Sequence, residues 1–413
     1  MMKERIKMNK ILILHANCAN RGDEAAVHAM VDEIYALDNN ISITISINGS
    51  VKYPNFPEEV KFIPRFPALG SKISMIEFMI CMITKGKLFF SKQASEFIDS
   101  VNSSDLIIHA PGGPNIGDIY RKSEFLILQR LNLVRKLGIK YMFYAPSMGP
   151  FNNKSRNYLR KKVILGAERV IVRDPISQNY VQNLVNTKEI ELALDSALQH
   201  EIDYIENDNK LNKYESLKLF LHNHNKCIGI TITDLLWHPN YRSTEKYKNN
   251  IKIVFEKFLP EIVKMGYGVI FIPQLYGTAN DFDLMKEFMK DKNNYFILDA
   301  NNDNYDAYFQ QFLISKLYAV VGMRYHSNIF SAKMGIPFIS ISYEQKMKGF
   351  MNNIGLDDFC IDIENLNFEL LINKFEKLEN NYDEYKTYLA NLHELFRSNS
   401  YKSTLAVKEI LNL

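Results

Sequence analysis

The stretch VGMRYHSNIFSAKMGIPFISISYEQKMKGF, residues 321–350, combines two short apolar runs with a helical segment between them. Gly335 ends the helical segment, as glycine commonly does at the C-terminus of a helix. Arg324 and His326 follow the first apolar run, and Lys346 follows the second. A strand–helix–strand unit predicts two parallel strands whose carboxyl ends lie at one edge of a sheet. The stretch therefore predicts an α/β fold with two cations and a histidine gathered at that edge.

The same alternation of apolar runs and helical segments continues on both sides of this unit. The predicted strands are KILILHA (10–16), ISITISI (41–47), DLIIHA (105–110), YMFYAPS (141–147), RVIVRD (169–174), CIGITIT (227–233), YGVIFIPQ (267–274), YFILDA (295–300), YAVVGM (318–323) and PFISISY (337–343). Such runs are typical of parallel strands that helices cover on both faces. The polar stretch 201–226 interrupts the pattern, which predicts two Rossmann-like domains, residues 1–205 and 206–413, the second with a charged helical tail. Two such domains facing each other would bind ligands in a cleft between the carboxyl ends of their strands.

Composition limits the classes of function. Of the 413 residues, 46% are hydrophobic and 23% are charged, which is typical of a globular protein. The net charge of +3 comes without a basic stripe interleaved with aromatic residues, so nucleic acid is not predicted as a partner. The four cysteines are scattered without metal-ligand spacing, which fits free thiols in a reducing compartment. Because the N-terminus lacks the apolar segment of a signal peptide and no apolar run approaches a membrane span, we expect a cytoplasmic protein.

The loop NCANRGDEA, residues 17–25, lies between the first predicted strand and the first predicted helix. Gly22 suits a tight turn with exposed backbone N–H groups. Asp23 is suited to cap the helix, and it is also suited to take a proton from a substrate hydroxyl. The loop by itself does not separate these two roles. Since the pattern is not GxGxxG, it does not indicate a dinucleotide.

Three further loops follow predicted strands. Gly112 and Gly113, in HAPGGPNIGD, suit close approach of the backbone to an anion or a sugar, and equally a plain tight turn. Arg173, in VRDPIS, is placed either for a phosphate or carboxylate or for a surface ion pair with Asp174. Gln274, in PQLYGTANDFD, suits a hydrogen bond to a sugar hydroxyl or an ordinary strand-to-helix loop.

Arg324, His326 and Lys346 together indicate an anionic small substrate. The planar guanidinium of arginine matches phosphate and carboxylate oxygens in bidentate fashion. Histidine titrates near neutral pH and can act as an acid or a base. The chain contains no GKS/T phosphate loop, no HExxH metal motif and no GxSxG elbow, so NTP hydrolysis, zinc chemistry and acyl transfer are not indicated.

These residues also carry a resemblance. The motifs NRGDEA (20–25), PGG (111–113), VRDPIS (172–177) and GMRYHSNIFSAKMGIPFISISYEQKMKGFM (322–351) together resemble the polysaccharide pyruvyltransferase family, from about residue 11 to residue 356. The resemblance implies a glycosyltransferase-B-like fold. It also implies transfer of a pyruvyl group from phosphoenolpyruvate to a sugar of a cell-surface polysaccharide precursor, giving a cyclic ketal and phosphate. The acceptor sugars are usually carried on a lipid, here expected as a lipid diphosphate.

The resemblance implies roles for particular residues, and it implies no metal and no cofactor besides phosphoenolpyruvate. Arg324, Arg173 and Lys346 are expected to bind the phosphate and carboxylate of the donor. His326 or Lys346 is expected to protonate the enol carbon, and Asp23 or His326 to deprotonate the sugar hydroxyl. The residues expected on the acceptor side are Asn20, Gly22, Gly112, Gly113, Asn115 and Gln274.

The segment SKISMIEFMICMITKGKLFFSKQ, residues 71–93, has apolar residues at helical spacing followed by Lys85, Lys87 and Lys92. A basic amphipathic segment can lie on an anionic bilayer, which would place the protein at the inner face of the cytoplasmic membrane. An amphipathic helix packed on the sheet explains the same pattern and is the preferred interpretation of the sequence alone.

Two other classes of function remain open. A nucleotide-sugar glycosyltransferase on the same fold would need a diphosphate contact and an acidic residue for the ribose, and Glu344 is a candidate. A non-catalytic sugar-binding or assembly subunit of a polysaccharide system is the third reading. Charged residues at three strand ends count against it, because charges are costly to hold in a cleft without a ligand.

Overall fold

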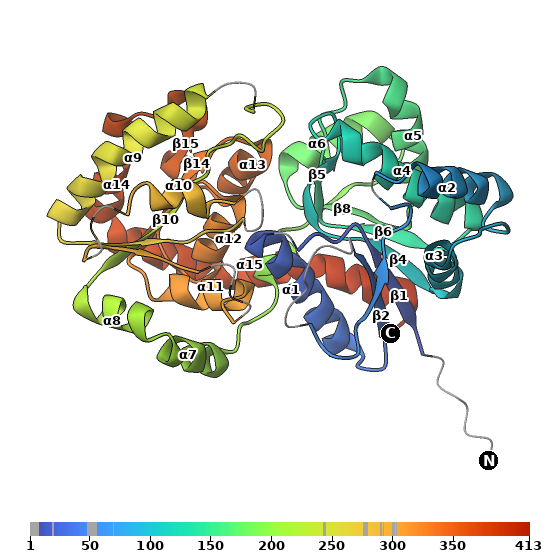
Figure 1. The fold of residues 1–413 in the computed structure, drawn as a ribbon, viewed down its shortest axis with the longest axis horizontal. Coiled ribbons are helices and arrows are strands. Elements are labelled where there is room, and N and C mark those ends of the chain that lie inside the picture. Colours follow the sequence, from blue (N-terminus) through green and yellow to red (C-terminus); the bar gives the residue numbers. More distant parts are fainter. Residues whose placement is uncertain are drawn as a thin grey trace, which may run out of the picture. The chain divides into compact units, whose positions relative to one another are not determined.

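The computed structural model describes residues 8–18, 20–47, 56–68, 70–242, 245–275, 280–289, 291, 293–299, 302 and 304–413 (Figure 1). Contacts between Cα atoms divide the chain into two units, each α/β. Unit 1 contains residues 26–200 and 399–413 together with the N-terminus up to Cys18, and unit 2 contains residues 20–25 and 201–398. The junction at 200/201 lies near the expected 205/206. The end of the charged tail belongs to unit 1, and residues 20–25 belong to unit 2, which the expected division did not foresee.

Unit 1 is built on a sheet of seven strands in the order β3-β2-β1-β4-β6-β8-β9, and every neighbouring pair is parallel. The strands are β1 (Lys10–Leu14), β2 (Ser42–Ile47), β3 (Lys61–Pro64), β4 (Leu106–His109), β6 (Tyr141–Tyr144), β8 (Val170–Val172) and β9 (Glu191–Leu192). The direction of strand order reverses between β1 and β4, so the carboxyl ends of these two strands form the topological switch point of the sheet.

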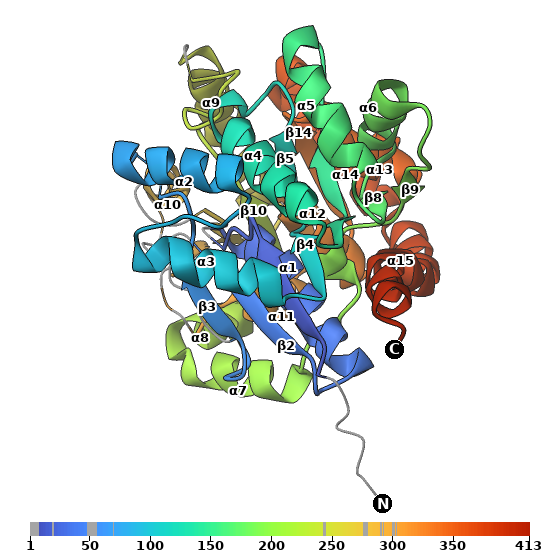
Figure 2. The ribbon, with the colours of Figure 1, turned by 90° about the vertical axis from the view of Figure 1, so that its right-hand side faces the viewer.

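Helices cover both faces of this sheet (Figure 2). The helices of unit 1 are α1 (Arg21–Leu37), α2 (Lys72–Thr84), α3 (Lys92–Ser103), α4 (Arg121–Leu137), α5 (Lys154–Leu165), α6 (Pro175–Val185) and the last part of α15 (Tyr382–Leu411). Side chains of α2 to α6 pack on one face, and side chains of α1 and α15 pack on the other. Because both faces are covered, the strands are the continuous apolar runs that the sequence shows.

A second, two-stranded parallel sheet lies in unit 1, made by β5 (Gly112–Ile116) and β7 (Pro146–Met148). The expected tight turn at Gly112 and Gly113 is therefore wrong, because both glycines are strand residues. At Gly117 a Cβ atom would lie 2.4 Å from the carbonyl oxygen of Gly149. That close approach of two backbones explains the glycine after β5.

Unit 2 is built on a sheet of six parallel strands in the order β12-β11-β10-β13-β14-β15. The strands are β10 (Cys227–Thr231), β11 (Gly268–Phe271), β12 (Tyr295–Ile297), β13 (Ala319–Gly322), β14 (Phe338–Ser342) and β15 (Cys360–Asp362). The helices are α7 (Tyr204–Lys213), α8 (Glu215–Asn223), α9 (Lys246–Lys264), α10 (Phe282–Lys286), α11 (Ala307–Ser315), α12 (Tyr325–Lys333), α13 (Gln345–Asn353), α14 (Phe368–Asn380) and the first part of α15. All ten strands predicted from the sequence are present in the two units.

Candidate functional site

The carboxyl edge of the unit 2 sheet carries Arg324, His326 and Lys346. Strands β13 and β14 are parallel neighbours, with Val320 opposite Phe338. Arg324 is the N-cap residue of α12, His326 lies in the first turn of α12, and Lys346 lies in the first turn of α13. The two neighbouring strands therefore bring the ends that carry these groups to one edge, as expected from the opening stretch.

Arg324 is held by a carboxylate and an aromatic ring. Its side chain forms an ion pair with Asp281 through Nε, 3.0 Å from Oδ2, and through Nη2, which also donates to Oγ1 of Thr233 at 3.1 Å. The guanidinium lies 4.8 Å from the ring centroid of Trp237. Burial alone would lower the pKa of Arg324, but Asp281 and the neighbouring phenol of Tyr343 outweigh burial and raise it. Arg324, 8% exposed, is therefore a permanent positive charge in a fixed orientation at this edge.

Lys346 is held by a second buried carboxylate. Its Nζ lies 2.6 Å from Oε2 of Glu344, while Oε1 of the same carboxylate lies 2.7 Å from Nε2 of His238. Burial would raise the pKa of Glu344, but Lys346 and His238 together hold it well below its usual range. Both oxygens of Glu344 are thus engaged by protein groups. A contact to a ribose, as the glycosyltransferase alternative requires, would have to share this buried carboxylate with Lys346 and His238.

His326 lies directly against residues 20–24. A Cβ atom at Gly22 would lie 2.0 Å from Nδ1 of His326, so only glycine leaves room for the imidazole. The ring of Tyr325 lies 5.0 Å from that of His326 between centroids, and its centroid lies 5.7 Å from Nζ of Lys346. His326 is 6% exposed. The packing of Gly22 against His326 thus explains the glycine of NRGDEA, which the motif alone does not reveal.

Residues 20–24 are bound to unit 2 by backbone and side-chain contacts. Asn20 forms an antiparallel bridge with Leu275, and the backbone N–H of Arg21 donates to the carbonyl of Gln274 at 2.9 Å. Arg21 forms a buried ion pair with Glu24 at 2.7 Å, and Glu24 accepts from the backbone N–H of Ala307 at 3.2 Å. These contacts hold the start of α1 beside the carboxyl ends of β11 and β13.

Asn20 and Asp23 bond each other. The backbone N–H of Asp23 donates to Oδ1 of Asn20 at 2.8 Å, and Nδ2 of Asn20 donates to Oδ2 of Asp23 at 2.7 Å. Asn20 is therefore the residue that caps α1, and the expected capping role of Asp23 is wrong. The partly buried carboxylate of Asp23 lies one residue beyond the glycine that packs on His326. Its role as a base stays a prediction.

Gln274 is a buried residue of the loop after β11. Its side-chain amide donates to Oε1 of Gln310 at 2.7 Å. Its backbone N–H and that of Leu275 both donate to Asp281, at 3.1 and 3.0 Å. Asp281 thus organises this loop and orients Arg324 at once. The structure gives Gln274 a part in holding the loop, and its predicted contact to a sugar stays a prediction.

Arg173 lies in unit 1 at the carboxyl end of β8 and is fully buried. It forms an ion pair with Asp195, and its Nε donates to Oγ of Ser147 at 2.9 Å. The alternative of a surface pair with Asp174 is wrong, because Asp174 caps α6 by accepting from Ser177 at 2.7 Å. Binding of a donor by Arg173 stays a prediction, and it would require the pair with Asp195 to open.

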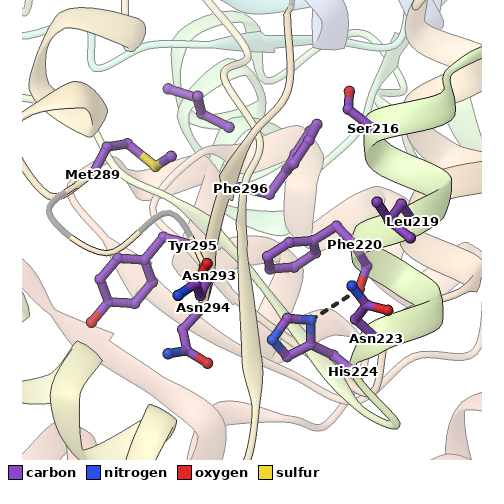
Figure 3. Close-up of a pocket in the computed structure, with 11 residues that line it drawn as sticks. Ser216, Leu219, Phe220, Asn223, His224, Met289, Asn293, Asn294, Tyr295 and Phe296 are labelled. Carbon is purple, nitrogen blue, oxygen red and sulfur yellow. Dashed lines mark hydrogen bonds between the residues drawn. The ribbon is translucent and has the colours of Figure 1, made fainter.

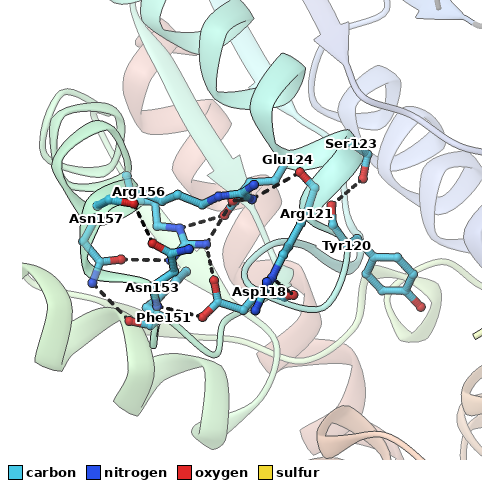
Figure 4. Close-up of polar contacts among 11 residues, drawn as sticks. Asp118, Tyr120, Arg121, Ser123, Glu124, Phe151, Asn153, Arg156 and Asn157 are labelled. Atoms are coloured by element: carbon cyan, nitrogen blue, oxygen red, sulfur yellow. Dashed lines mark hydrogen bonds and ion pairs between the residues drawn. The ribbon is translucent and has the colours of Figure 1, made fainter. Parts of the chain in front are cut away.

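The predicted acceptor residues Gly112, Gly113 and Asn115 all lie on β5 of unit 1. An ion-pair network fixes the loop that connects β5 to α4 (Figure 4). Arg160 is fully buried and lies 2.8 Å from Asp118 and 2.7 Å from Glu124. The acidic residue that ends HAPGGPNIGD is therefore occupied in holding α4 and α5 together. The three acceptor assignments stay predictions.

Two histidines at the switch point of the unit 1 sheet were missed in the sequence. His15 follows β1, His109 ends β4, and their ring centroids lie 4.9 Å apart. Burial, and then His109, Arg130 and Arg65, lower the pKa of His15 well below its usual value. Burial lowers the pKa of His109 to about 4. Their only sequence signal was an interrupted apolar run, which does not distinguish a buried histidine from a catalytic one.

In unit 2 the sequence interpretation missed Asp281, Trp237 and His238, which orient the cations. Trp237 and His238 follow β10 in the segment TDLLWHPN, a polar and aromatic stretch at a strand end. That position was the available signal, because strand ends of one parallel sheet share an edge. The pairing of Asp281 with Arg324 spans 43 residues and had no local signal.

A pocket of about 690 Å³ in unit 2 lies elsewhere, between α8 and the edge strand β12 (Figure 3). Nδ1 of His224, which lines it, donates to the carbonyl of Phe220 at 2.9 Å. No Asp, Glu, Lys or Arg is among the residues that line it, so the pocket does not suit a small anion.

Within the described ranges, no group of three or more His, Cys, Asp or Glu side chains is placed to hold a metal ion. Likewise, no described helix is long and apolar enough to cross a membrane.

Solved structures share this architecture. The UDP-GlcNAc 2-epimerase of Neisseria meningitidis, bound to UDP-GlcNAc, has a TM-score of 0.60 at 10% identity, covering 98% of this chain and 100% of that one. A ugt transferase from Siraitia grosvenorii in complex with UDP has a TM-score of 0.56 at 10% identity, covering 97% and 99%. At this identity the likeness concerns the fold alone. The two parallel-sheet α/β units are GT-B-like, which confirms the expected fold class.

Sequence comparison adds the family. The amylovoran biosynthesis protein AmsJ of Erwinia amylovora is 22% identical over 413 residues, covering 94% of this chain and 96% of that protein. The family profile described as polysaccharide pyruvyl transferase matches residues 20–345, from Asn20 to the first residue of α13, directly before Lys346. Because this match spans most of the chain, the protein belongs to the polysaccharide pyruvyl transferase family.

Proposed function

We propose that the protein transfers a pyruvyl group from phosphoenolpyruvate to a sugar of an exopolysaccharide or capsule precursor, forming a cyclic ketal and releasing phosphate. We further propose an acceptor carried on a lipid diphosphate, reached from the cytoplasm at the inner face of the membrane, with no metal or other cofactor. Membership of the family and the similarity to an exopolysaccharide biosynthesis protein support the general reaction. The donor, the ketal and the lipid carrier are the finer parts of the proposal.

The observation that carries the donor assignment is the pair of oriented cations at one edge of the unit 2 sheet. Arg324 and Lys346 each have a buried carboxylate partner, Asp281 and Glu344, that fixes the side chain. A small molecule with a phosphate and a carboxylate offers two anionic groups to two cations. Positioned charges of this kind stabilise charge that develops during reaction without reorganising at that moment.

The chemistry divides into two bond-forming steps. A proton added to the methylene carbon of phosphoenolpyruvate, from His326 or Lys346, creates positive character at the neighbouring carbon, and a sugar hydroxyl attacks that carbon. The attacking hydroxyl loses its proton to Asp23 or His326. A second hydroxyl of the same sugar then attacks the same carbon and closes the ketal. The phosphate leaves with the electron pair of its bond to that carbon and takes up the proton of the second hydroxyl. Arg324 and Lys346 stabilise the leaving phosphate.

Turnover of two variants tests these roles. With phosphoenolpyruvate and a lipid-linked oligosaccharide pool from the source cells, phosphate release and the mass of the product are measured. His326→Ala is expected to abolish turnover while largely sparing donor binding, and Arg324→Ala is expected to raise the KM for phosphoenolpyruvate. Wild-type rates from His326→Ala would remove that residue from the mechanism. Turnover of a nucleotide-sugar in place of phosphoenolpyruvate would establish the glycosyltransferase alternative instead.

A further inference from the structure

Helix α2 is apolar on two opposite faces. Its inner face places Phe78 and Cys81 in the core of unit 1, beside side chains of α3 and α4. Its outer face carries Ile73 and Ile83, which are 81% and 79% exposed, with Ile76 and Met79 between them also exposed. A helix that is apolar all round is normally covered on all sides. Within unit 1 the outer face of α2 is not covered, although it has the composition of a buried surface.

The loop after α2 extends this apolar face. Phe90 is 76% exposed and Leu88 is also exposed. Glu77, on the inner side of α2, fixes the loop by accepting from the backbone N–H groups of Phe90 and Ser91, both at 2.6 Å, and from Oγ of Ser91 at 2.7 Å. The exposed apolar side chains are therefore presented by a bonded helix–loop unit.

Exposed lysines surround these apolar side chains. Lys72, Lys85, Lys87 and Lys92 are all exposed. Glu77 is the single acidic residue in the sequence from 72 to 92, and it is buried in the loop contacts. Burial would raise the pKa of Glu77, but the hydrogen bonds from Phe90 and Ser91 outweigh burial and lower it. Lys92 lies 3.7 Å from the partly exposed carboxylate of Glu96. The surface is thus apolar with a net positive charge, and Glu77 is turned inward.

We propose that this surface, made by Ile73, Ile76, Met79, Ile83, Leu88 and Phe90 with the four lysines, docks the protein on an anionic lipid bilayer. The apolar side chains enter the boundary between headgroups and acyl chains, and the lysines contact the anionic headgroups. The packing preferred from the sequence alone is confirmed for the inner face of α2, and the proposal concerns its outer face. The inference deepens the proposed function by placing the enzyme at its lipid-linked acceptor, yet it is testable without either substrate.

Cosedimentation of the full-length protein with vesicles tests the proposal. Wild type is expected to bind vesicles containing about a third phosphatidylglycerol, and to bind phosphatidylcholine vesicles at least ~10-fold more weakly, because the lysines contribute through surface potential. The triple variant Ile73→Ser, Ile83→Ser, Phe90→Ser is expected to lose binding to both. Lys85→Gln with Lys87→Gln and Lys92→Gln is expected to lose the preference for anionic vesicles and its salt dependence.

The control is Ile205→Ser, which removes an isoleucine of unit 2 that is 78% exposed, and it is expected to bind like wild type. Thermal unfolding and phosphoenolpyruvate titration are expected to be unchanged in the triple variant, since none of its residues touches the site.

Absence of wild-type binding to anionic vesicles would overturn the proposal, as would equal loss of vesicle binding in the control. Concentration-dependent self-association that the triple variant abolishes, without vesicle binding, would assign the surface to a second copy. Failure of phosphoenolpyruvate to bind would leave the vesicle result standing and count against the proposed function alone.

Discussion

The carboxyl edges of the two sheets handle charge in opposite ways. In unit 2, Arg324 and Lys346 each pair with a buried carboxylate, and Glu344 and Arg324 have pKa values shifted toward their charged forms. In unit 1, His15 and His109 lie beside Arg130, which bonds the carbonyls of a neighbouring loop. Burial lowers the pKa values of both histidines, and burial with Arg65 lowers that of Arg130 to about 9. The edge of the unit 2 sheet thus holds cations in ion pairs, whereas burial at the edge of the unit 1 sheet favours neutral histidines.

The comparison indicates that clustered basic residues do not by themselves identify a site. Arg324 and Lys346 in unit 2 are fixed by ion pairs with Asp281 and Glu344, and residues 20–24 lie against the neighbouring His326. Both unit 1 histidines are buried, and a proton on His15 would also meet the charges of Arg130 and Arg65. We therefore propose that the anion chemistry belongs to unit 2, and we expect the switch point of unit 1 to govern acid stability. If that division holds, substitutions at the unit 2 edge should change turnover, and a substitution at the unit 1 switch point should change stability.

The largest effect is expected from Gly22→Ala. The new Cβ would lie 2.0 Å from Nδ1 of His326, so either the imidazole or residues 20–24 must move. We expect turnover to fall by roughly 100-fold or more, because a displacement of about 1 Å is that costly to positioned catalysis. Steady-state kinetics and thermal unfolding measure the two consequences. In the double variant with His326→Gly the clashing atoms, which include Cβ of His326 at 2.5 Å, are all removed. The stability lost through Gly22→Ala should then recover, while turnover stays lost. Unchanged kinetics in the single variant would separate residues 20–24 from the site.

A smaller loss is expected from Glu344→Gln. The substitution keeps the shape but removes the charge that Lys346 and His238 share, so Lys346 loses its fixed position. We expect kcat/KM to fall by about 10- to 100-fold, with a shifted pH profile, since a buried charge partner is costly to lose. The matched control is Glu261→Gln, which neutralises an exposed carboxylate paired with Lys264 at 2.6 Å and should change nothing measurable. If kcat/KM is the same in the two variants, the pair of Glu344 with Lys346 matters no more for turnover than the exposed pair of Glu261 with Lys264.

The smallest effect is expected on stability and concerns unit 1. The folded pKa of His109 is about 4 against 6.5 for the free side chain, so the unfolded chain binds more protons between these values. The free energy of unfolding should therefore fall as the pH drops from about 6.5 to about 4, by on the order of 3 kcal/mol from this residue. Denaturant unfolding at several pH values measures the slope, which His109→Gln should reduce. His393→Gln, at an exposed histidine, serves as the control. A pH-independent wild type over this range would contradict the assignment.

Periodic features of the molecule were predictable and long-range ones were not. Apolar runs located ten strands, and the strand–helix–strand unit at 321–350 correctly placed Arg324 and Lys346 on neighbouring strand ends. Short or weakly apolar strands were missed, including β5, where glycine and proline read as a turn. The docking of residues 20–25 on unit 2 was also missed, because it joins segments about 250 to 300 residues apart and follows no local pattern.

The candidate site was likewise predictable in its local motifs and not in its long-range contacts. The residue types that carry charge were found from motifs, but their partners were not, since Asp281 and His238 reach them only through the fold. Arg173 shows the converse limit. A strand-end arginine was read as open to a ligand, whereas the fold buries it against Asp195.

The central claim is that Arg324 at the edge of the unit 2 sheet binds phosphoenolpyruvate. Calorimetric titration of the wild type with phosphoenolpyruvate, beside uridine and guanosine diphosphates, tests it most directly. Arg324→Ala and Arg324→Lys are titrated in parallel, because the lysine variant keeps a charge opposite Asp281 if the alanine variant is unstable. The account predicts that phosphoenolpyruvate binds the wild type and that both variants bind it at least ~10-fold more weakly, while nucleoside diphosphates do not compete. Binding of a nucleoside diphosphate alone, or unchanged affinity for phosphoenolpyruvate in both variants, would contradict the account.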